Sequence, residues 1–409
     1  MAHPEDRDRR RAALRRSRRR RLTWGSVAAG AVLAAAAAAC TMQAGSGGST
    51  TSQAGGSSTS GGGSPGSRPS SSTPTSAPAS FRVGITSYRW SEPGGVTVNP
   101  QTGGALPGRS LTVEIRYPTL EGGTATETSA ATPASRFGPY PVVVFAHGFE
   151  TMPATYAPLL DAWVKAGFVV VSPVFPDENE VTVQQDGGFQ SNAVATNLES
   201  DEVNEPADIA FVLKQVEALD SKGSGALVSG LLDMAKVALA GQSDGANVVA
   251  GLVFDSRFSA QRAELPVAPK AVAVLSGEPF QEEGDSYSAS PASPPVLFVQ
   301  SNADTCNPPE QAALLYTDLA GDPFRWFVEL LGARHLPPYI GVPPYSAIVT
   351  RVTTTFFELE LGWHAKGLSG SSVTAAGTSP GLAAVYGSSL PPIPNPADLG
   401  CGPPPPLPG

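Results

Sequence analysis

A serine flanked by glycines is the residue of this 409-residue chain whose type and setting best suit covalent chemistry. Gly241-Gln242-Ser243-Asp244-Gly245 matches G-x-S-x-G, follows the apolar run 237–240 and precedes a small-residue helical pattern over 246–252. A strand, a tight turn and a helix in this order predict a nucleophile elbow, whose strained turn exposes the serine hydroxyl. A Gly-rich loop whose serine only caps the helix would carry the same motif, so other residues must decide.

A serine hydroxyl becomes a good nucleophile when a histidine accepts its proton and a carboxylate orients that histidine. Of the four histidines, His3 precedes a basic N-terminal segment and His364 follows a long helical stretch. His147 comes directly after an apolar strand pattern, where we expect a structural hydrogen-bonding role. His335 lies in a loop after the apolar run 324–331, and α/β sheets present catalytic groups at the carboxyl ends of their strands. We therefore predict His335 as the base.

The orienting carboxylate is expected between Ser243 and His335, because these sites commonly run Ser, Asp or Glu, His along the chain. Asp304 follows the strand pattern 296–300, and Glu278 follows the strand pattern before it. We favour Asp304 and keep Glu278 as its rival.

Backbone N–H groups are the usual donors to the oxyanion of acyl transfer. We expect one from Asp244, directly after the nucleophile, and one from Phe149 in the segment His147-Gly148-Phe149. Three separate loops thus supply matching parts of one acyl-transfer site.

These segments together resemble the α/β-hydrolase superfamily, in particular its dienelactone hydrolase-like, cutinase-like and platelet-activating-factor acetylhydrolase-like esterases. The resemblance covers about residues 81 to 365. It rests on the elbow and on 111–118 (LTVEIRYP), 144–149 (VFAHGF), 165–173 (KAGFVVVSP), Asp304-Thr305 and 332–335 (GARH). It implies an α/β-hydrolase fold with a mostly parallel sheet of about eight strands and helices on both faces. It also implies a Ser243-His335-Asp304 triad with an oxyanion hole from Phe149 and Asp244.

The chain departs from its relatives at several positions. Gln242 and Asp244 stand where many relatives carry His or Trp and Met or Gln, and Ser276-Gly277-Glu278-Pro279 replaces the Trp-His pair common in polyester-degrading members. The nucleophile is serine, whereas dienelactone hydrolases proper commonly use cysteine. The natural substrate therefore stays open.

The rest of the catalytic region alternates strand and helix patterns, which predicts a mostly parallel sheet covered on both faces. Helices are expected over 157–166 and 207–219, and antiparallel edge strands over 81–88 and 111–117. The acid-rich stretch 177–205 is either an excursion over the mouth of the site or a plain surface loop. Residues 366–409, rich in Pro, Gly and Ser, are expected to form a mobile tail.

The N-terminus predicts export. Ten arginines in residues 1–21 precede an uncharged, Ala-rich stretch that ends at Cys40, and Ala37-Ala38-Ala39-Cys40 resembles a lipobox. We expect residues 1–40 to be an export signal and Cys40 to be lipidated, which would place the protein on the outer face of the cytoplasmic membrane. A cleaved, freely secreted form, a retained signal helix and a twin-arginine signal are the alternatives. Residues 41–80, almost all Gly, Ser, Thr and Pro, predict a flexible tether.

Charge and cysteine content narrow the possible partners. Outside residues 1–40 the chain carries 17 basic and 33 acidic groups (27 − 10 and 36 − 3), a net charge of −16 that disfavours nucleic acid and anionic substrates. Neutral esters, either small molecules or lipid-like, fit better. With Cys40 lipidated, Cys306 and Cys401 remain as a disulfide pair in an oxidising compartment. We expect no metal and no cofactor.

The sequence thus predicts a serine carboxylesterase that works through an acyl-enzyme. A cell-envelope acyltransferase with the same triad, and a tethered non-catalytic binding protein on this scaffold, are the alternatives.

Overall fold

The computed structural model describes residues 78, 80–122, 126–188, 192–221, 223–280 and 286–401. The predicted export signal 1–40 with Cys40, and the predicted tether apart from Pro78 and Ser80, lie outside the described residues. Among the described helices, none is both long enough and apolar enough to cross a bilayer.

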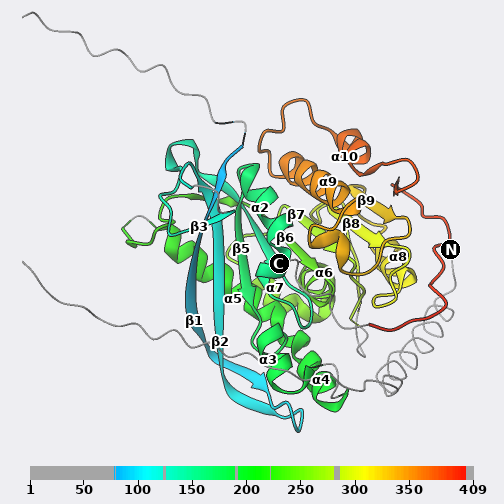
Figure 1. The fold of residues 1–409 in the computed structure, drawn as a ribbon, viewed down its shortest axis with the longest axis horizontal. Coiled ribbons are helices and arrows are strands. Elements are labelled where there is room, and N and C mark those ends of the chain that lie inside the picture. Colours follow the sequence, from blue (N-terminus) through cyan, green and yellow to red (C-terminus); the bar gives the residue numbers. More distant parts are fainter. Residues whose placement is uncertain are drawn as a thin grey trace, which may run out of the picture. The chain divides into compact units, whose positions relative to one another are not determined.

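A ten-stranded sheet organises the described part of the chain, in the order β10-β9-β8-β7-β6-β4-β5-β2-β1-β3 (Figure 1). Its six central strands are parallel: β5 (Val169–Val174), β4 (Tyr140–Ala146), β6 (Leu232–Gln242), β7 (Ala271–Leu275), β8 (Val296–Ser301) and β9 (Arg325–Leu330). Most of their residues are apolar and buried, as expected for strands covered on both faces.

Antiparallel strands flank this parallel centre. β1 (Arg82–Val98) and β2 (Ala105–Thr119) form a long hairpin that joins the sheet through β5, which confirms the two antiparallel strands predicted there. The expected strand number of about eight is corrected to ten, because β3 (Glu127–Ser129) and β10 (Ala383–Tyr386) extend the two edges. The order and direction of the strands are those of the predicted α/β-hydrolase fold.

Helices cover both faces of the sheet and enclose two apolar cores. Alternate residues of β4 face opposite cores: Val142 and Val144 pack with one set of helices, and Val143 and Phe145 with the other. The first set contains α5 (Glu205–Asp220), α6 (Asp244–Phe254) and α8 (Pro309–Asp318), and the second contains α2 (Ala157–Lys165), α9 (Tyr345–Glu360) and α10 (Gly370–Gly377). The predicted helices 157–166 and 207–219 correspond to α2 and α5. Shorter helices in the other described connections are η1 (Ser135–Phe137), η2 (Pro153–Tyr156), η5 (Ser256–Phe258), α7 (Ser259–Ala263) and η6 (Pro337–Tyr339).

The expectation of a mobile C-terminal tail is wrong for much of the segment 366–401. α10 packs against α9, and β10 pairs with β9 at the edge of the sheet. Farther on, Cys401 forms a disulfide with Cys306, the pair expected from the sequence. Such a bond is typical of proteins outside the reducing cytosol.

The described residues of the acid-rich excursion between β5 and α5 include the helices α3 (Glu180–Gln185), α4 (Asn192–Glu199) and η4 (Ser200–Asn204). Figure 1 shows α3 and α4 beside the end of the hairpin at which β1 is connected to β2. Arg109 on β2 makes this connection with hydrogen bonds to Asp208 on α5 and Asp201 on η4. We call this excursion the acidic insertion.

Candidate active site

Ser243 occupies the turn between β6 and α6 in a strained conformation. Its φ of 57° and ψ of −125° lie where residues other than glycine are rarely found. A side chain at Gly241 would place its Cβ 2.0 Å from the Gly245 carbonyl oxygen, and one at Gly245 would lie 2.2 Å from the Ala146 carbonyl oxygen. Only glycine fits at either position, so the motif glycines are explained by close backbone contact. The Ser243 side chain makes no capping hydrogen bond to α6, which contradicts the alternative of a simple helix cap.

Ser243, His335 and Asp304 lie within hydrogen-bonding distance of one another in the expected order. Ser243 Oγ is 2.9 Å from His335 Nε2, and His335 Nδ1 is 2.7 Å from Asp304 Oδ2. Each residue lies at or just beyond the carboxyl end of a strand: β6, β9 and β8, respectively. Because parallel strands end at the same edge of the sheet, three loops distant in sequence meet there. This arrangement allows a proton to pass from the serine to the histidine while the aspartate fixes the ring.

Asp304 is buried and held from several sides. The backbone N–H groups of Cys306 and Asn307 donate to its Oδ1, and the Gln300 side chain donates to its Oδ2. The disulfide at Cys306 anchors this loop to the C-terminal segment. The rival Glu278 is also buried, and its backbone N–H donates to Asn247 Oδ1. His335 Nδ1 is hydrogen bonded to Asp304, so Asp304 is the carboxylate that the structure pairs with this ring.

The surroundings of His335, whose side chain is 18% exposed, and of fully buried His147 shift the pKa values of the two rings in opposite directions. Burial lowers the pKa of His335, but the carboxylates of Asp304, Asp244 and Glu278 outweigh it, and the pKa lies above the usual 6.5. Burial lowers the pKa of His147 to about 4. The His147 Nδ1–H donates to the Gly148 carbonyl and its Nε2 accepts from the Phe175 N–H, so this ring is neutral and braces the backbone. This is the structural role expected for it.

The segment around Phe149 lies against the elbow. A Cβ at Gly148 would lie 2.8 Å from the Ser243 Cβ, so only glycine allows this approach. Phe149 packs on Val183, Val194 and Leu198, a small apolar cluster in the acidic insertion. Asp244 is the first residue of α6, and N–H groups in a first helical turn have no acceptor within the helix. Of the two residues expected to form the oxyanion hole, Asp244 follows Ser243 directly, and Phe149 follows Gly148, whose backbone lies against the Ser243 side chain.

Sequence reasoning did not identify a buried polar network behind these residues. Tyr156 Oη donates to Gln242 Oε1 at 2.6 Å, and Gln242 Nε2 lies 3.2 Å from His335 Nε2. The Gly148 N–H donates to the same tyrosine oxygen at 3.3 Å. Gln242 lies inside the G-x-S-x-G motif, and this position next to the serine is a signal from which a polar contact with the site could have been predicted. Tyr156 carries no sequence signal, because a buried tyrosine in a helical stretch is ordinary.

Buried carboxylates crowd the acidic insertion and the start of α5. Burial and neighbouring carboxylates raise the pKa values of Glu178 and Glu205 well above the usual 4.5. Burial raises the pKa of Asp208 to about 7 despite its bond to Arg109, and that of Asp177 to about 6. Asp244 is among the charges that act on Glu178, so the cluster extends to the elbow. Within the described residues, no group of three or more His, Cys, Asp or Glu side chains is arranged to hold a metal ion.

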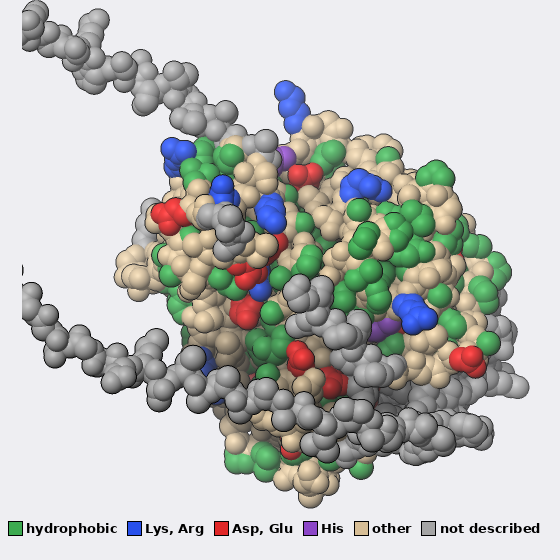
Figure 2. Space-filling model, in the orientation of Figure 1, with side chains coloured by type: hydrophobic (Ala, Val, Ile, Leu, Met, Phe, Trp, Pro, Cys, Tyr) green, Lys and Arg blue, Asp and Glu red, His purple; other side chains and the backbone are tan. Residues whose placement is uncertain are grey.

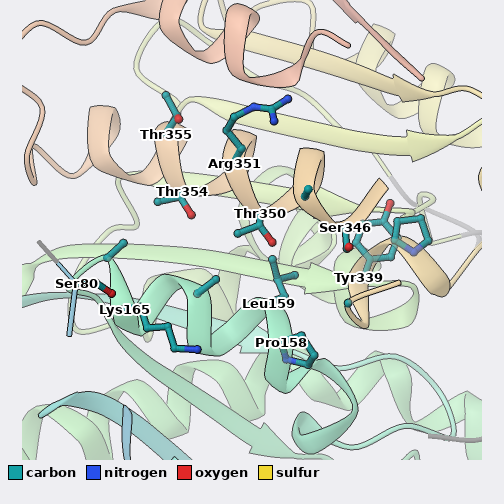
Figure 3. A pocket seen from close by; sticks show the side chains of 15 residues that line it. Ser80, Pro158, Leu159, Lys165, Tyr339, Ser346, Thr350, Arg351, Thr354 and Thr355 are labelled. Atoms are coloured by element: carbon teal, nitrogen blue, oxygen red, sulfur yellow. The ribbon is translucent and has the colours of Figure 1, made fainter. Parts of the chain in front are cut away.

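A groove of about 700 Å³ lies between α2 and α9, and its lining contains none of Ser243, Asp304 and His335 (Figure 3). Ser346, Thr350 and Thr354 line it from α9, opposite Lys165 of α2 (Figure 3). No histidine or carboxylate lines it to activate these hydroxyls, so Ser243 remains the candidate nucleophile. On the face drawn in Figure 2, Lys and Arg side chains of the described residues are spread among uncharged and acidic ones.

Comparisons with known proteins give a distant structural likeness. No family model and no curated protein sequence matches the chain. Among solved structures, the chain is similar to a ferulic acid esterase from Streptomyces cinnamoneus, at 18% sequence identity and a TM-score of 0.48. The match covers 70% of this chain and 92% of that one. A likeness this distant does not extend to activity or substrate.

Proposed function

We propose that the protein is a serine hydrolase that cleaves carboxylic esters through an acyl-enzyme. The observation that carries this proposal is the continuous hydrogen-bonded series from Ser243 Oγ through the His335 ring to buried Asp304. The strained backbone of Ser243 supports it further, because strain of this kind collects at functional sites.

The reaction follows from the positions of these groups. Ser243 Oγ attacks the ester carbonyl carbon while its proton passes to His335 Nε2, and the carbonyl oxygen takes up the negative charge. The N–H groups of Phe149 and Asp244 donate to this oxyanion. The bond to the alcohol oxygen then breaks as His335 returns its proton to that oxygen. Water repeats the sequence on the acyl-enzyme, releasing the acid and restoring Ser243.

The surroundings of the site favour uncharged substrates. Asp244 and Glu278 act electrostatically on His335, and the buried carboxylates of the acidic insertion adjoin the elbow. A second negative charge on the acyl group would be repelled there. We therefore propose neutral esters as substrates, within the dienelactone hydrolase-like, cutinase-like and platelet-activating-factor acetylhydrolase-like branch that the sequence resembles. The Cys306–Cys401 disulfide supports a site of action outside the cytoplasm, with Cys40 proposed as the lipid attachment point.

Substitution of the nucleophile tests the proposal. Ser243→Ala should lower kcat for p-nitrophenyl acetate by about 10⁴-fold or more, because removing a triad member abolishes covalent catalysis. The melting temperature should stay close to that of the parent. A fluorophosphonate should label the parent and not the variant, since only an activated serine reacts.

Ser172→Ala is the matched control. Ser172 is a second buried serine, 0% exposed against 7% for Ser243; it lies in β5 and has a hydroxyl without a hydrogen-bond partner. Its loss should leave both turnover and labelling in place. Unchanged hydrolysis in Ser243→Ala would refute the assignment, as would a parent that neither turns over esters nor reacts with the fluorophosphonate.

A further inference from the structure

The side-chain amide of Gln242 contacts the proposed base, His335, and connects through Tyr156 to the segment 147–149, which we call the oxyanion loop. This amide has no role in the reaction steps described above. Its Nε2 lies 3.2 Å from His335 Nε2, the same atom that faces Ser243 Oγ at 2.9 Å. Its Oε1 accepts a 2.6 Å hydrogen bond from Tyr156. Gln242 is 1% exposed and Tyr156 is fully buried, so the hydrogen bond between them is shielded from solvent, and the contact between Gln242 and His335 is partly buried.

The hydroxyl of Tyr156 sets the orientation of this amide. Thr151 Oγ1 donates its only hydrogen to the Gly148 carbonyl at 2.5 Å, and the Gly148 N–H donates to Tyr156 Oη. The Tyr156 hydrogen is therefore directed to Gln242 Oε1 at 2.6 Å, in preference to Thr151 at 3.2 Å. An amide whose oxygen accepts from Tyr156 turns its NH₂ group toward His335.

We propose that Gln242 is a positioning residue of this ester hydrolysis, whose amide donates to His335 Nε2 and favours the uncharged imidazole that accepts the Ser243 proton. This inference rests on the function proposed above. The neutral ring presents a lone pair at Nε2, which an amide N–H stabilises. Once Nε2 carries a proton, two N–H groups face each other, and the proton is released more readily to the leaving alcohol.

The charged groups around His335 favour the protonated ring, which is the opposite of what the Gln242 amide favours. Asp304 from the loop after β8, Asp244 from the start of α6 and Glu278 from the loop after β7 all favour the charged imidazolium. Tyr156 and Tyr339 also lie nearby, and burial raises the pKa of each far above 10, so both stay neutral. The Gln242 amide is an uncharged group whose hydrogen bond favours the neutral ring. It thereby widens the pH range over which the base is available.

The test measures the protonation midpoint of His335 in the full chain by NMR of ¹⁵N-labelled histidine. Gln242→Met keeps the length of the side chain and removes the amide. The midpoint should rise by about 0.5 to 1 pH unit, which corresponds to the loss of one hydrogen bond. The acid limb of kcat/KM for p-nitrophenyl acetate should move in the same direction. Tyr156→Phe, which releases the amide from its orientation, should give a smaller rise and serves if Gln242→Met does not fold.

Two control variants make the same chemical changes at buried sites on other elements. Gln311→Met on α8 and Tyr140→Phe at the start of β4 should leave the midpoint unchanged. An unchanged or lower midpoint in Gln242→Met, or equal rises in the controls, would overturn the inference. Because the NMR titration needs no turnover, an unchanged midpoint alongside Ser243-dependent hydrolysis counts against this inference alone. A raised midpoint without such hydrolysis counts against the proposed function.

Discussion

At the scale of single residues, the charges around His335 set the pH response of the site. Burial lowers the pKa of this ring, but Asp304, Asp244 and Glu278 together raise it above 6.5. The base must be neutral to accept the Ser243 proton, so activity should fall as the pH drops through that raised value. Glu278 is the charge that can be changed without altering a bond within the triad.

Glu278→Gln should therefore move the acid limb of kcat/KM to lower pH, because it removes a negative charge that stabilises the imidazolium. The direction is opposite to that expected for Gln242→Met. Activity at high pH should persist, whereas loss of the carboxylate that orients the base costs about 10⁴-fold in kcat. A pH–rate profile of the variant and the parent distinguishes these cases. A collapse of activity at all pH values would instead identify Glu278 as the orienting acid.

At the scale of elements, Arg109 connects the β1–β2 hairpin to the acidic insertion. Arg109 is 3% exposed, and its guanidinium donates to both Asp208 oxygens, at 2.6 and 2.5 Å, and to Asp201 at 3.0 Å. The Val98 N–H donates to Asp177 nearby at 2.6 Å. The insertion also packs Val183, Val194 and Leu198 against Phe149, so the hairpin indirectly supports the oxyanion loop.

Arg109→Met should destabilise the protein by about 3 to 5 kcal/mol, because it leaves buried carboxylates without their cation. The loss should be smaller at pH 5.5 than at pH 8, since Asp208, with a pKa of about 7, takes up a proton on acidification. Denaturant unfolding at both pH values measures this difference. Arg89→Met is the control: Arg89 is an exposed arginine of β1 bonded to Ser110, and its loss should cost little. Equal, small losses in both variants would show that the Arg109 pairs do not hold the hairpin.

The sequence was informative where a chemical group follows an apolar strand. Ser243, Asp304 and His335 each follow such a run, and parallel strands bring their carboxyl ends to one edge, so their convergence was predictable. Tyr156 was not, because its role depends on contacts with Gln242 and Gly148 that no local pattern encodes.

The structure of two other segments could not be predicted from the sequence, for the same physical reason. Residues 177–205 resemble a solvated acidic loop, since nothing local shows that Arg109 is buried beside them. The C-terminal segment resembles a mobile tail because Pro and Gly dominate it, yet the short β10 strand gains its stability by pairing with β9. In both cases a partner distant in sequence decides the structure.

At the scale of the whole molecule, several buried acids hold protons in the folded state that the unfolded chain would release. Burial raises the pKa values of Asp208, Asp161 and Glu360 to about 7, and those of Glu178 and Glu205 well above 4.5. A carboxyl whose folded pKa is raised stabilises the fold fully below its unfolded pKa, and this contribution is lost as the pH rises through the folded value. His147, with a folded pKa of about 4, opposes this trend only below pH 6.5, where the unfolded ring gains a proton.

The free energy of unfolding should therefore fall as the pH rises from 6.5 through about 7, the folded pKa of Asp208, Asp161 and Glu360, and should level off toward pH 8.5. Above pH 6.5 His147 is mostly neutral in both the folded and the unfolded state. Each such proton contributes a slope of about 1.4 kcal/mol per pH unit. Glu205→Gln removes one of these protons and should flatten the curve by up to that amount. Glu217→Gln, at an exposed position of the same helix α5, should leave the slope unchanged. Urea unfolding of the parent and both variants at pH 6.5, 7.5 and 8.5 provides the measurement. If stability did not fall across this window, the buried carboxyls of the acidic insertion would be ionised in the folded state throughout, and the electrostatic environment assigned to the elbow would be wrong.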